Sequence, residues 1–154
     1  MKVQEVMTKN VEGIQPSTTI SEVAKKMESL DVGVLPVMQG NKAVGILTDR
    51  DITVRAVAKG LDPDSTKAGQ IMTKELEFCS QDEGVREAAR HMQDNKIRRL
   101  LVNDSQGKVA GIIALGDLAV AANEELSGKT LEQVSKPAQP SRQISGTSEE
   151  KLMV

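Results

Sequence analysis

Aromatic residues are almost missing from this chain of 154 residues: Phe78 is the only one, and there is no tryptophan or tyrosine. The core must therefore be built from valine, isoleucine, leucine, methionine and alanine. The shortage argues against a surface for single-stranded nucleic acid, because such surfaces stack bases on aromatic side chains. A net charge of −2, with no run of five lysines or arginines, argues against a nucleic-acid groove as well.

Long apolar runs and cysteine pairs are also missing. No stretch approaches the roughly 18 apolar residues of a membrane-spanning helix, and the first residues, MKVQEVMTKNVEG, lack the apolar centre of a signal peptide. Cys79 is the only cysteine, so no internal disulfide can form, which fits a reducing compartment. We therefore expect a cytoplasmic protein that neither spans a membrane nor binds nucleic acid.

The chain does contain an internal repeat. Three segments recur 65 residues further along, and a fourth recurs after 66. The matching pairs are EVMTKNVE (5–12) with QIMTKELE (70–77), EVAKKM (22–27) with EAARHM (87–92), VLPV (34–37) with RLLV (99–102), and GILTDRD (45–51) with GIIALGD (111–117). Matches in the same order along both halves indicate two copies of one folding unit.

Each copy is predicted to contain five elements in the order β-α-β-β-α. A short strand comes first, VEGIQ in one copy and LEFCS in the other. A helix then runs from Ile20 to about Leu30, and its copy from Val85 to about Asn95, with apolar residues at helical spacing. Thr19 and Glu22 stand where a capping box would begin the first of these helices.

Two apolar strands and a second helix complete each copy. The predicted strands are GVLPVMQ (33–39) and KAVGILT (42–48), and in the second copy RRLLVND (98–104) and KVAGIIA (108–114). The second helix is predicted from about Asp51 to Lys59, and from about Asp117 to Leu126. One unit leaves a face of its sheet uncovered, so we expect an α+β (α/β) fold with the two copies packed sheet to sheet about a pseudo-twofold axis.

The repeats are assigned to residues 1–66 and 67–134. The Pro/Ser/Gln-rich segment 135–154 has no apolar period and is expected to be disordered. Residues 128–136 are expected to extend the last helix or to begin a short extra one.

GILTDRD places a hydroxyl, two carboxylates and a guanidinium in the turn between a strand and a helix. Asp51 and its copy Asp117 could simply cap the helices that follow, a contact that stabilises by about 1 kcal/mol. A carboxylate there can also accept hydrogen bonds from both hydroxyls of a ribose, each charge-assisted bond contributing roughly 1.5–3 kcal/mol. The local sequence leaves both interpretations open.

The pattern of Met-Thr, Ala-x-x-Met, Leu-Pro-Val and Gly-Ile-x-Thr-x-x-Asp resembles the CBS (cystathionine β-synthase) domain. The resemblance covers residues 1 to about 126 and recurs in both halves, so the chain is similar to a stand-alone tandem pair, or Bateman module. It implies a regulatory module that binds an adenine nucleotide (AMP, ADP or ATP) in the cleft between the repeats, with S-adenosylmethionine as a further candidate. It also implies a homodimer formed through the helices and a regulated partner of unknown identity.

The resemblance further implies which polar residues bind the ligand. Asp51 and Asp117 would hold the ribose, and Thr48 would bind phosphate, a role that Ala114 in the second copy cannot share. Arg98 and Arg99 would neutralise phosphate from across the pseudo-twofold axis. Arg50 is a weaker candidate for the same role, because we expect its side chain to point into solvent.

Three consecutive residues of the first copy are expected to face the base. Val34 and Leu35 would flank it beside Asp51. Pro36 has no N–H, so it leaves one strand carbonyl without its usual partner and free to read the edge of a purine. Each of these residues also has a purely structural interpretation. Thr48 would be an ordinary strand-end threonine, Arg98 and Arg99 would be surface arginines, and Pro36 would be an edge-strand proline.

Two other functions compete with ligand sensing. An interaction module with vestigial clefts would only dimerise and dock a partner, and Ala114 slightly favours it. An enzyme is disfavoured, because the sequence has no nucleophile–base pair, no metal-ligand spacing and no P-loop. His91 stands alone on a helix and Cys79 lies in a strand, so we expect a surface histidine and a small buried hydrophobe.

Overall fold

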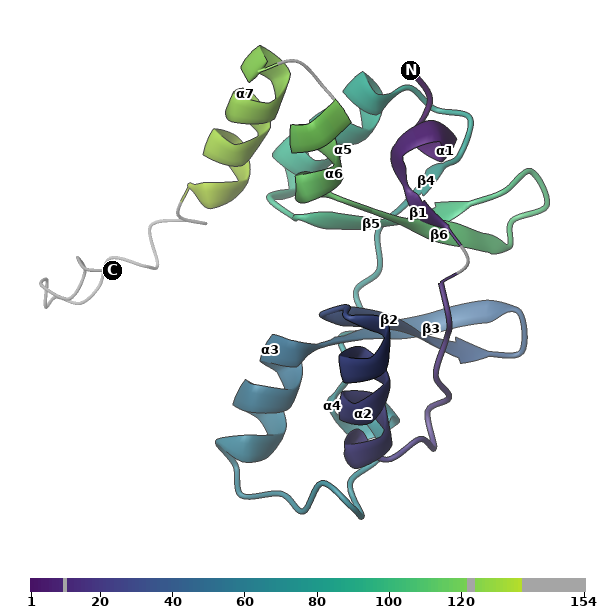
Figure 1. Ribbon diagram of the computed structural model, residues 1–154, viewed down its shortest axis with the longest axis vertical. Coiled ribbons are helices and arrows are strands. Elements are labelled where there is room, and N and C mark those ends of the chain that lie inside the picture. The colour runs from purple at the N-terminus through teal and green to yellow at the C-terminus, as the bar shows by residue number, and fades with distance from the viewer. Residues whose placement is uncertain (10, 122–123, 137–154) are drawn as a thin grey trace, which may run out of the picture.

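The chain folds into two halves, each a small sheet with helices on its outer side, and the two sheets face each other (Figure 1). The computed structural model describes residues 1–9, 11–121 and 124–136. The α+β architecture with sheet-to-sheet packing is the one expected from the repeat. The expected disordered tail lies outside the described residues from residue 137 onward.

The first half follows the predicted order of elements except at its start, where VEGIQ (11–15) forms only one isolated bridge and not the predicted strand. It contains α2 (Ile20–Leu30), β2 (Val34–Gln39), β3 (Lys42–Thr48) and α3 (Asp49–Ile52), which continues as a π-helical turn, η1 (Thr53–Val57). The β2–β3 hairpin turns at Gly40, whose φ of +66° favours a residue without a Cβ. α2 begins with the predicted capping box: Glu22 N–H donates to the Thr19 hydroxyl at 3.3 Å, and Thr19 N–H donates to the Glu22 carboxylate at 3.0 Å.

The second half repeats this order. It contains β4 (Phe78–Ser80), α5 (Val85–Asn95), β5 (Arg99–Asn103), β6 (Val109–Ala114) and α6 (Leu115–Ala121). α5 begins at Gly84, which has no hydroxyl, so only half of a capping box forms, with Gly84 N–H donating to the Glu87 carboxylate at 3.0 Å. β4 lies parallel to β5, whereas the corresponding segment of the first half makes a single parallel bridge, Ile14 with Val37.

The two halves exchange the segments that precede them. α1 (Val3–Val6) and β1 (Thr8–Lys9) belong to the second half: β1 pairs with β6, and Val3 is fully buried in the second-half core. The corresponding α4 (Ala68–Ile71) packs into the first-half core instead. Just after it, Thr73 and Ile46 exchange backbone hydrogen bonds of 2.9 and 2.8 Å. Each packed half is thus completed by a segment from the other repeat.

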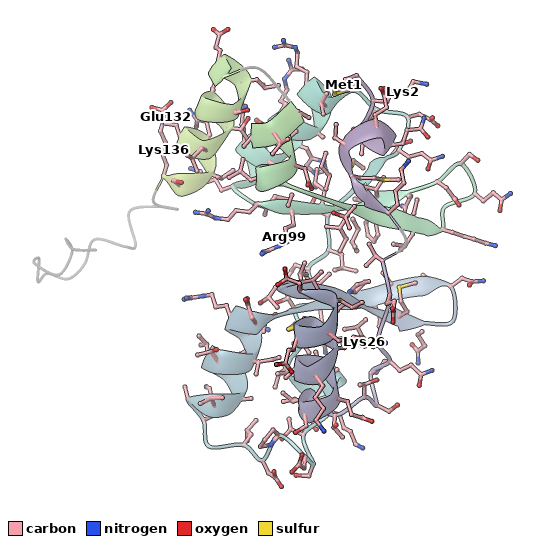
Figure 2. All side chains as sticks on the ribbon, viewed as in Figure 1. Met1, Lys2, Lys26, Arg99, Glu132 and Lys136 are labelled. Atoms are coloured by element: carbon pink, nitrogen blue, oxygen red, sulfur yellow. The ribbon has the colours of Figure 1, made fainter. Side chains whose placement is uncertain are left out.

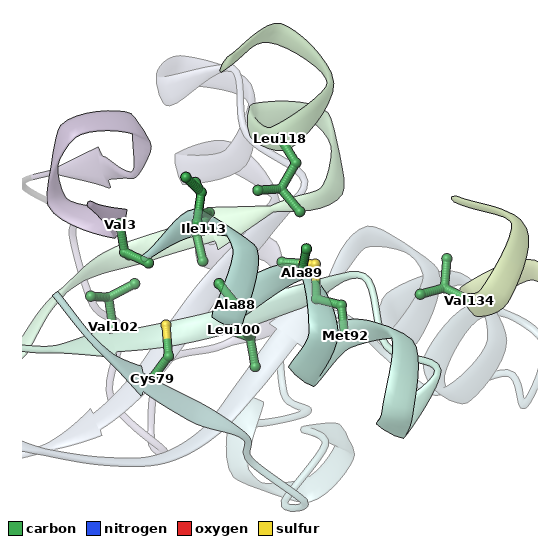
Figure 3. Close-up of a cluster of buried hydrophobic side chains, with 11 residues drawn as sticks. Val3, Cys79, Ala88, Ala89, Met92, Leu100, Val102, Ile113, Leu118 and Val134 are labelled. Carbon is green, nitrogen blue, oxygen red and sulfur yellow. The ribbon is translucent and has the colours of Figure 1, made fainter. Parts of the chain in front are cut away.

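Each half has an aliphatic core of its own. Figure 3 shows the second, where Val3, Ala89, Met92, Leu118 and Val134 come together from four helices. The first core is built in the same way from α2, β2, β3 and α4. No aromatic ring enters either cluster, and Phe78 is partly exposed, as the composition requires.

The second half carries one further helix, α7 (Glu124–Ser135), so the helix predicted from about Asp117 to Leu126 is divided between α6 and α7. α7 packs against α5 and α6. The Thr130 hydroxyl, which is fully buried, donates to the Leu126 carbonyl at 2.7 Å and accepts from the Gln93 side-chain amide at 2.9 Å. Among the described residues, the first half has no counterpart of α7.

Candidate ligand-binding clefts

Two clefts lie where the two halves meet, and the 65-residue repeat relates one to the other. Cleft A, of about 320 Å³, is lined by Val34, Ile46, Thr73, Lys96, Arg98 and Arg99, among others. Cleft B, of about 390 Å³, is lined by Lys9, Glu12, Leu35, Arg99, Ala114 and Asp117, and by Val34. Each cleft therefore takes side chains from both halves.

Thr48 and Asp51 form a reciprocal cap at the start of α3. Asp51 N–H donates to the Thr48 hydroxyl and Thr48 N–H donates to the Asp51 carboxylate, both at 3.0 Å. The Asp51 carboxylate also accepts from the hydroxyl of Thr73, a wall residue of cleft A, at 3.3 Å. Neither Thr48 nor Asp51 lines that cleft directly, and Asp51 is only 9% exposed. Helix capping is therefore present at this motif, whatever else it does.

Arg55 also engages Asp51, and the sequence interpretation missed it. Its Nε lies 3.7 Å from the Asp51 carboxylate, and its Nη1 donates to the carbonyls of Ile71 and Met72 at 3.0 and 3.2 Å. The i,i+4 spacing from Asp51 is the sequence signal that could have found it. Thr73, the other partner, repeats the position of Thr8 in the recurring Met-Thr pair. The Asp51 carboxylate thus has three protein partners.

The Asp117 carboxylate has fewer protein partners than the Asp51 carboxylate. Its carboxylate accepts from Ala114 N–H at 2.7 Å, and no other hydrogen bond or ion pair reaches it from the described part of the chain. The residue in the place of Arg55 is Ala121, which carries no charge. Asp117 is partly exposed and lines cleft B. Of the two motif aspartates, it is the more exposed and has more hydrogen-bond acceptor capacity left for a ligand.

The aliphatic residues expected beside Asp51 divide between the clefts. Val34, at the start of β2, lines both of them. Leu35 lines cleft B with Asp117 and Ile112, not cleft A beside Asp51 as expected. The pseudo-twofold packing brings β2 against the end of β6, so this strand serves the cleft whose carboxylate comes from the second half.

Pro36 does free a strand carbonyl, and that carbonyl belongs to Glu12. In the second half, Leu101 N–H donates to the Glu77 carbonyl at 3.0 Å, and these two residues are the copies of Pro36 and Glu12. Proline has no N–H to offer, and no hydrogen bond from the described residues reaches the Glu12 carbonyl. Pro36 itself is buried, while Glu12 lines cleft B. The residue that carries the free acceptor therefore lines the same cavity as Asp117.

The arginines differ in where they lie. Arg98 and Arg99 are exposed, and their side chains have no hydrogen bond or salt bridge to the described residues. Arg98 lines cleft A, Arg99 lines both clefts, and both border a further cavity between α6 and α7. Arg50 is exposed and lines neither cleft, as its expected outward orientation implies. The cations available to a ligand are therefore those of the second half.

His91 and Cys79 lie outside both clefts. His91 lies on α5, partly exposed, and its Nε2 is 2.8 Å from the Glu77 carboxylate. Cys79 is buried; that burial, with a smaller contribution from the nearby Glu83 carboxylate, raises the pKa of its thiol to about 12. No group of three His, Cys, Asp or Glu side chains suited to a metal occurs among the residues described, nor does a helix long and apolar enough to cross a membrane.

Known proteins share this architecture. A family model of the CBS domain matches residues 3–57 and again residues 68–124. The chain belongs to the CBS-domain family. The CBS domain-containing protein YhcV of Bacillus subtilis (strain 168) is 37% identical over 134 residues, which span 86% of this chain and 94% of that protein. The tandem CBS pair expected from the repeat is confirmed.

Solved CBS proteins superpose on this CBS pair. The CBS domain protein TA0289 of Thermoplasma acidophilum matches with a TM-score of 0.75 at 26% identity, over 86% of this chain and 75% of that one. CBSX2, solved in complex with AMP, matches with a TM-score of 0.65 at 27% identity, over 79% of this chain and 95% of that one. At least one relative of this fold and similarity thus holds an adenine nucleotide.

Proposed function

We propose that this CBS pair is a regulatory module that binds an adenine nucleotide between its two halves. The observation that carries the proposal is the composition of cleft B. It is lined by Asp117, by Glu12, whose carbonyl has no partner among the described residues, by the aliphatic Val32 and Val34, and by the exposed Arg99. The Asp117 carboxylate suits a ribose diol, and the Glu12 carbonyl suits the donor edge of a base. The aliphatic side chains suit the faces of that base, and the Arg99 guanidinium suits a phosphate.

The free carbonyl favours adenine over bases without an amino group at the same edge. A carbonyl oxygen only accepts hydrogen bonds, so it needs a donor such as the exocyclic amino group of adenine. A purine needs no aromatic partner there, because aliphatic side chains can cover both of its faces. The AMP bound by CBSX2 supports this ligand class.

Cleft A offers a more cationic surface for the same class of ligand. Lys96, Arg98 and Arg99 line it together with Thr73, and they outnumber the two carboxylates there, Glu75 and Glu77. Cations at both clefts favour AMP, ADP or ATP over S-adenosylmethionine, whose sulfonium group carries a positive charge. The hydrogen bonds at the two motifs favour Asp117 over Asp51 as the ribose ligand, because three protein groups contact the Asp51 carboxylate and only Ala114 N–H among the described residues contacts that of Asp117.

Calorimetric titration of the purified, nucleotide-stripped protein tests the proposal. We expect AMP, ADP or ATP to bind, and GTP and S-adenosylmethionine to bind at least tenfold more weakly. Intrinsic fluorescence cannot replace this measurement, because the chain has no tryptophan or tyrosine. If no adenine nucleotide gives a heat of binding, and equilibrium dialysis also detects no binding, the proposal is wrong.

A second candidate function is an interaction module whose clefts stay empty. The observation that favours it is the state of the first motif, where Thr73 and Arg55 already occupy the Asp51 carboxylate. On this alternative the helices carry the function, docking a second copy and a regulated protein. It predicts no nucleotide binding but unchanged self-association, so the same titration separates the two functions.

A further inference from the structure

Arg99 and Val34 occupy the same position in the two halves. Arg99 follows Val34 by the 65 residues of the repeat. Val34 pairs with Thr48 across the β2–β3 ladder, and Arg99 pairs with Ala114 across the β5–β6 ladder. Both residues line cleft A, and both line cleft B. Together with Ile112 they form the wall that the two clefts share. At the position that the repeat makes equivalent, this wall carries a guanidinium from one half and an isopropyl group from the other.

The guanidinium on this shared wall has no protein partner in the part of the chain that the structure describes. Arg99 is exposed, and no carboxylate within the described ranges forms a salt bridge with it. Figure 2 shows its side chain extending from β5 into the space between the two halves. Guanidinium groups bind phosphate with two parallel hydrogen bonds, and the single positive charge of Arg99 can neutralise only one phosphate charge.

The other charges of the two clefts do not replace Arg99. Cleft A also has Lys96 and Arg98, but the carboxylates of Glu75 and Glu77 line it as well. The other cation lining cleft B is Lys9, which shares the cleft with Asp117 and with Glu12, the latter paired with Lys26 at 3.0 Å. A phosphate bound with Arg99 in one cleft therefore leaves the other cleft without net positive charge for a second one.

We infer that this CBS pair binds one phosphorylated nucleotide at a time, because its two clefts share the single guanidinium of Arg99. The inference rests on the proposed function and adds the rule by which the two clefts are filled. A second phosphorylated ligand loses a charge-assisted contact and meets the first ligand's charge, so we expect it to bind roughly ten- to a hundredfold more weakly. Adenosine has no phosphate and does not depend on Arg99.

Reciprocal exchange of the two wall residues tests the inference in the full chain. Calorimetry should give one tight AMP site per chain for the parent protein. Val34→Arg supplies a second guanidinium at the equivalent place and should give two. Arg99→Val should weaken AMP binding roughly ten- to a hundredfold and leave adenosine binding unchanged. Arg50→Val, an exposed arginine outside both clefts, is the matched control and should change neither.

The outcomes separate the inference from the proposed function. Two AMP sites of equal affinity in the parent, an Arg99→Val protein that binds AMP like the parent, or a Val34→Arg protein that keeps one site would overturn the shared-guanidinium inference alone. A parent that binds neither AMP nor adenosine would overturn the proposed function as well. Thermal melts show whether each variant is folded; both substituted positions lie outside the fully buried core, so we expect folded proteins.

Discussion

The two motif aspartates illustrate how the same residue takes different roles in two copies of one unit. Asp51 accepts hydrogen bonds from Thr48 and Thr73 and faces Arg55, whereas Asp117 accepts only from Ala114 among the described residues. Asp117→Ala should therefore weaken AMP binding by roughly 1.5–3 kcal/mol, or about ten- to a hundredfold, at a cost of about 1 kcal/mol in stability. Calorimetry and urea denaturation measure the two effects separately.

Asp51→Ala is the matched comparison, and it should show the opposite balance. The substitution removes a cap and leaves the Thr73 hydroxyl and Arg55 without their acceptor, so we expect a loss of about 1–3 kcal/mol in the free energy of unfolding. AMP affinity should change less than in Asp117→Ala. Equal losses of affinity in the two variants would show that both motifs hold ribose.

Cys79 should be inert in the native state. Its pKa of about 12 keeps the thiol protonated at pH 8, and only the thiolate reacts with alkylating reagents. Because the folded pKa is raised, the unfolded chain loses this proton first, and the contribution of Cys79 to stability falls as the pH rises above about 8.5. Iodoacetamide at pH 8 should label the chain only after denaturation; rapid labelling of the native protein would contradict this account.

At the scale of helices and strands, α7 depends on one buried hydroxyl. Thr130 accepts from Gln93 of α5 and donates to Leu126 within α7. Thr130→Val keeps the shape but leaves the Gln93 amide unpaired, and should cost about 1–3 kcal/mol in the free energy of unfolding. Ser127→Ala, which removes a less buried hydroxyl bonded to the Leu118 carbonyl, is the control and should cost less. A chemical denaturation midpoint unchanged in Thr130→Val would show that α7 does not support the second half.

Local patterns account for the elements that the sequence predicted well. α2 and α5 follow from apolar spacing and capping, and the hairpins follow from apolar strands around a turn. The exchange of α1 and α4 between the halves was not predictable in this way, because helical and strand periods do not say which sheet a segment joins. Local patterns also do not predict how the two halves pack. For this reason Leu35 lines cleft B, although we expected it beside the first motif.

The candidate site shows the same division between local and non-local signals. The repeat pointed to Asp117 and the family resemblance to Arg98 and Arg99, and all three residues line the clefts. The ranking of the two aspartates depends on Arg55 and Thr73, whose contacts appear only after folding. Pro36 predicted that some strand carbonyl would lack a partner. Which residue carries that carbonyl, Glu12, depends on the parallel pairing of the neighbouring segment, which the sequence does not give.

At the scale of the whole molecule, the outer helices leave apolar side chains in solvent. Val54 and Val57 after α3, and Val120 on α6, are 43%, 68% and 89% exposed. We expect these valines to become buried against a second copy. Light scattering at micromolar concentration should give about twice 16.6 kDa for the parent chain. Val57→Glu should shift it to the monomer, and a parent that is monomeric at every concentration would refute the dimer.

Titration of AMP into the stripped protein shows whether the space between the two halves holds an adenine nucleotide. We expect saturable binding of one AMP per chain, with an affinity at least tenfold lower in folded Asp117→Ala protein. The proposed function is wrong if AMP fails to bind the folded parent, or if it binds Asp117→Ala as tightly as the parent.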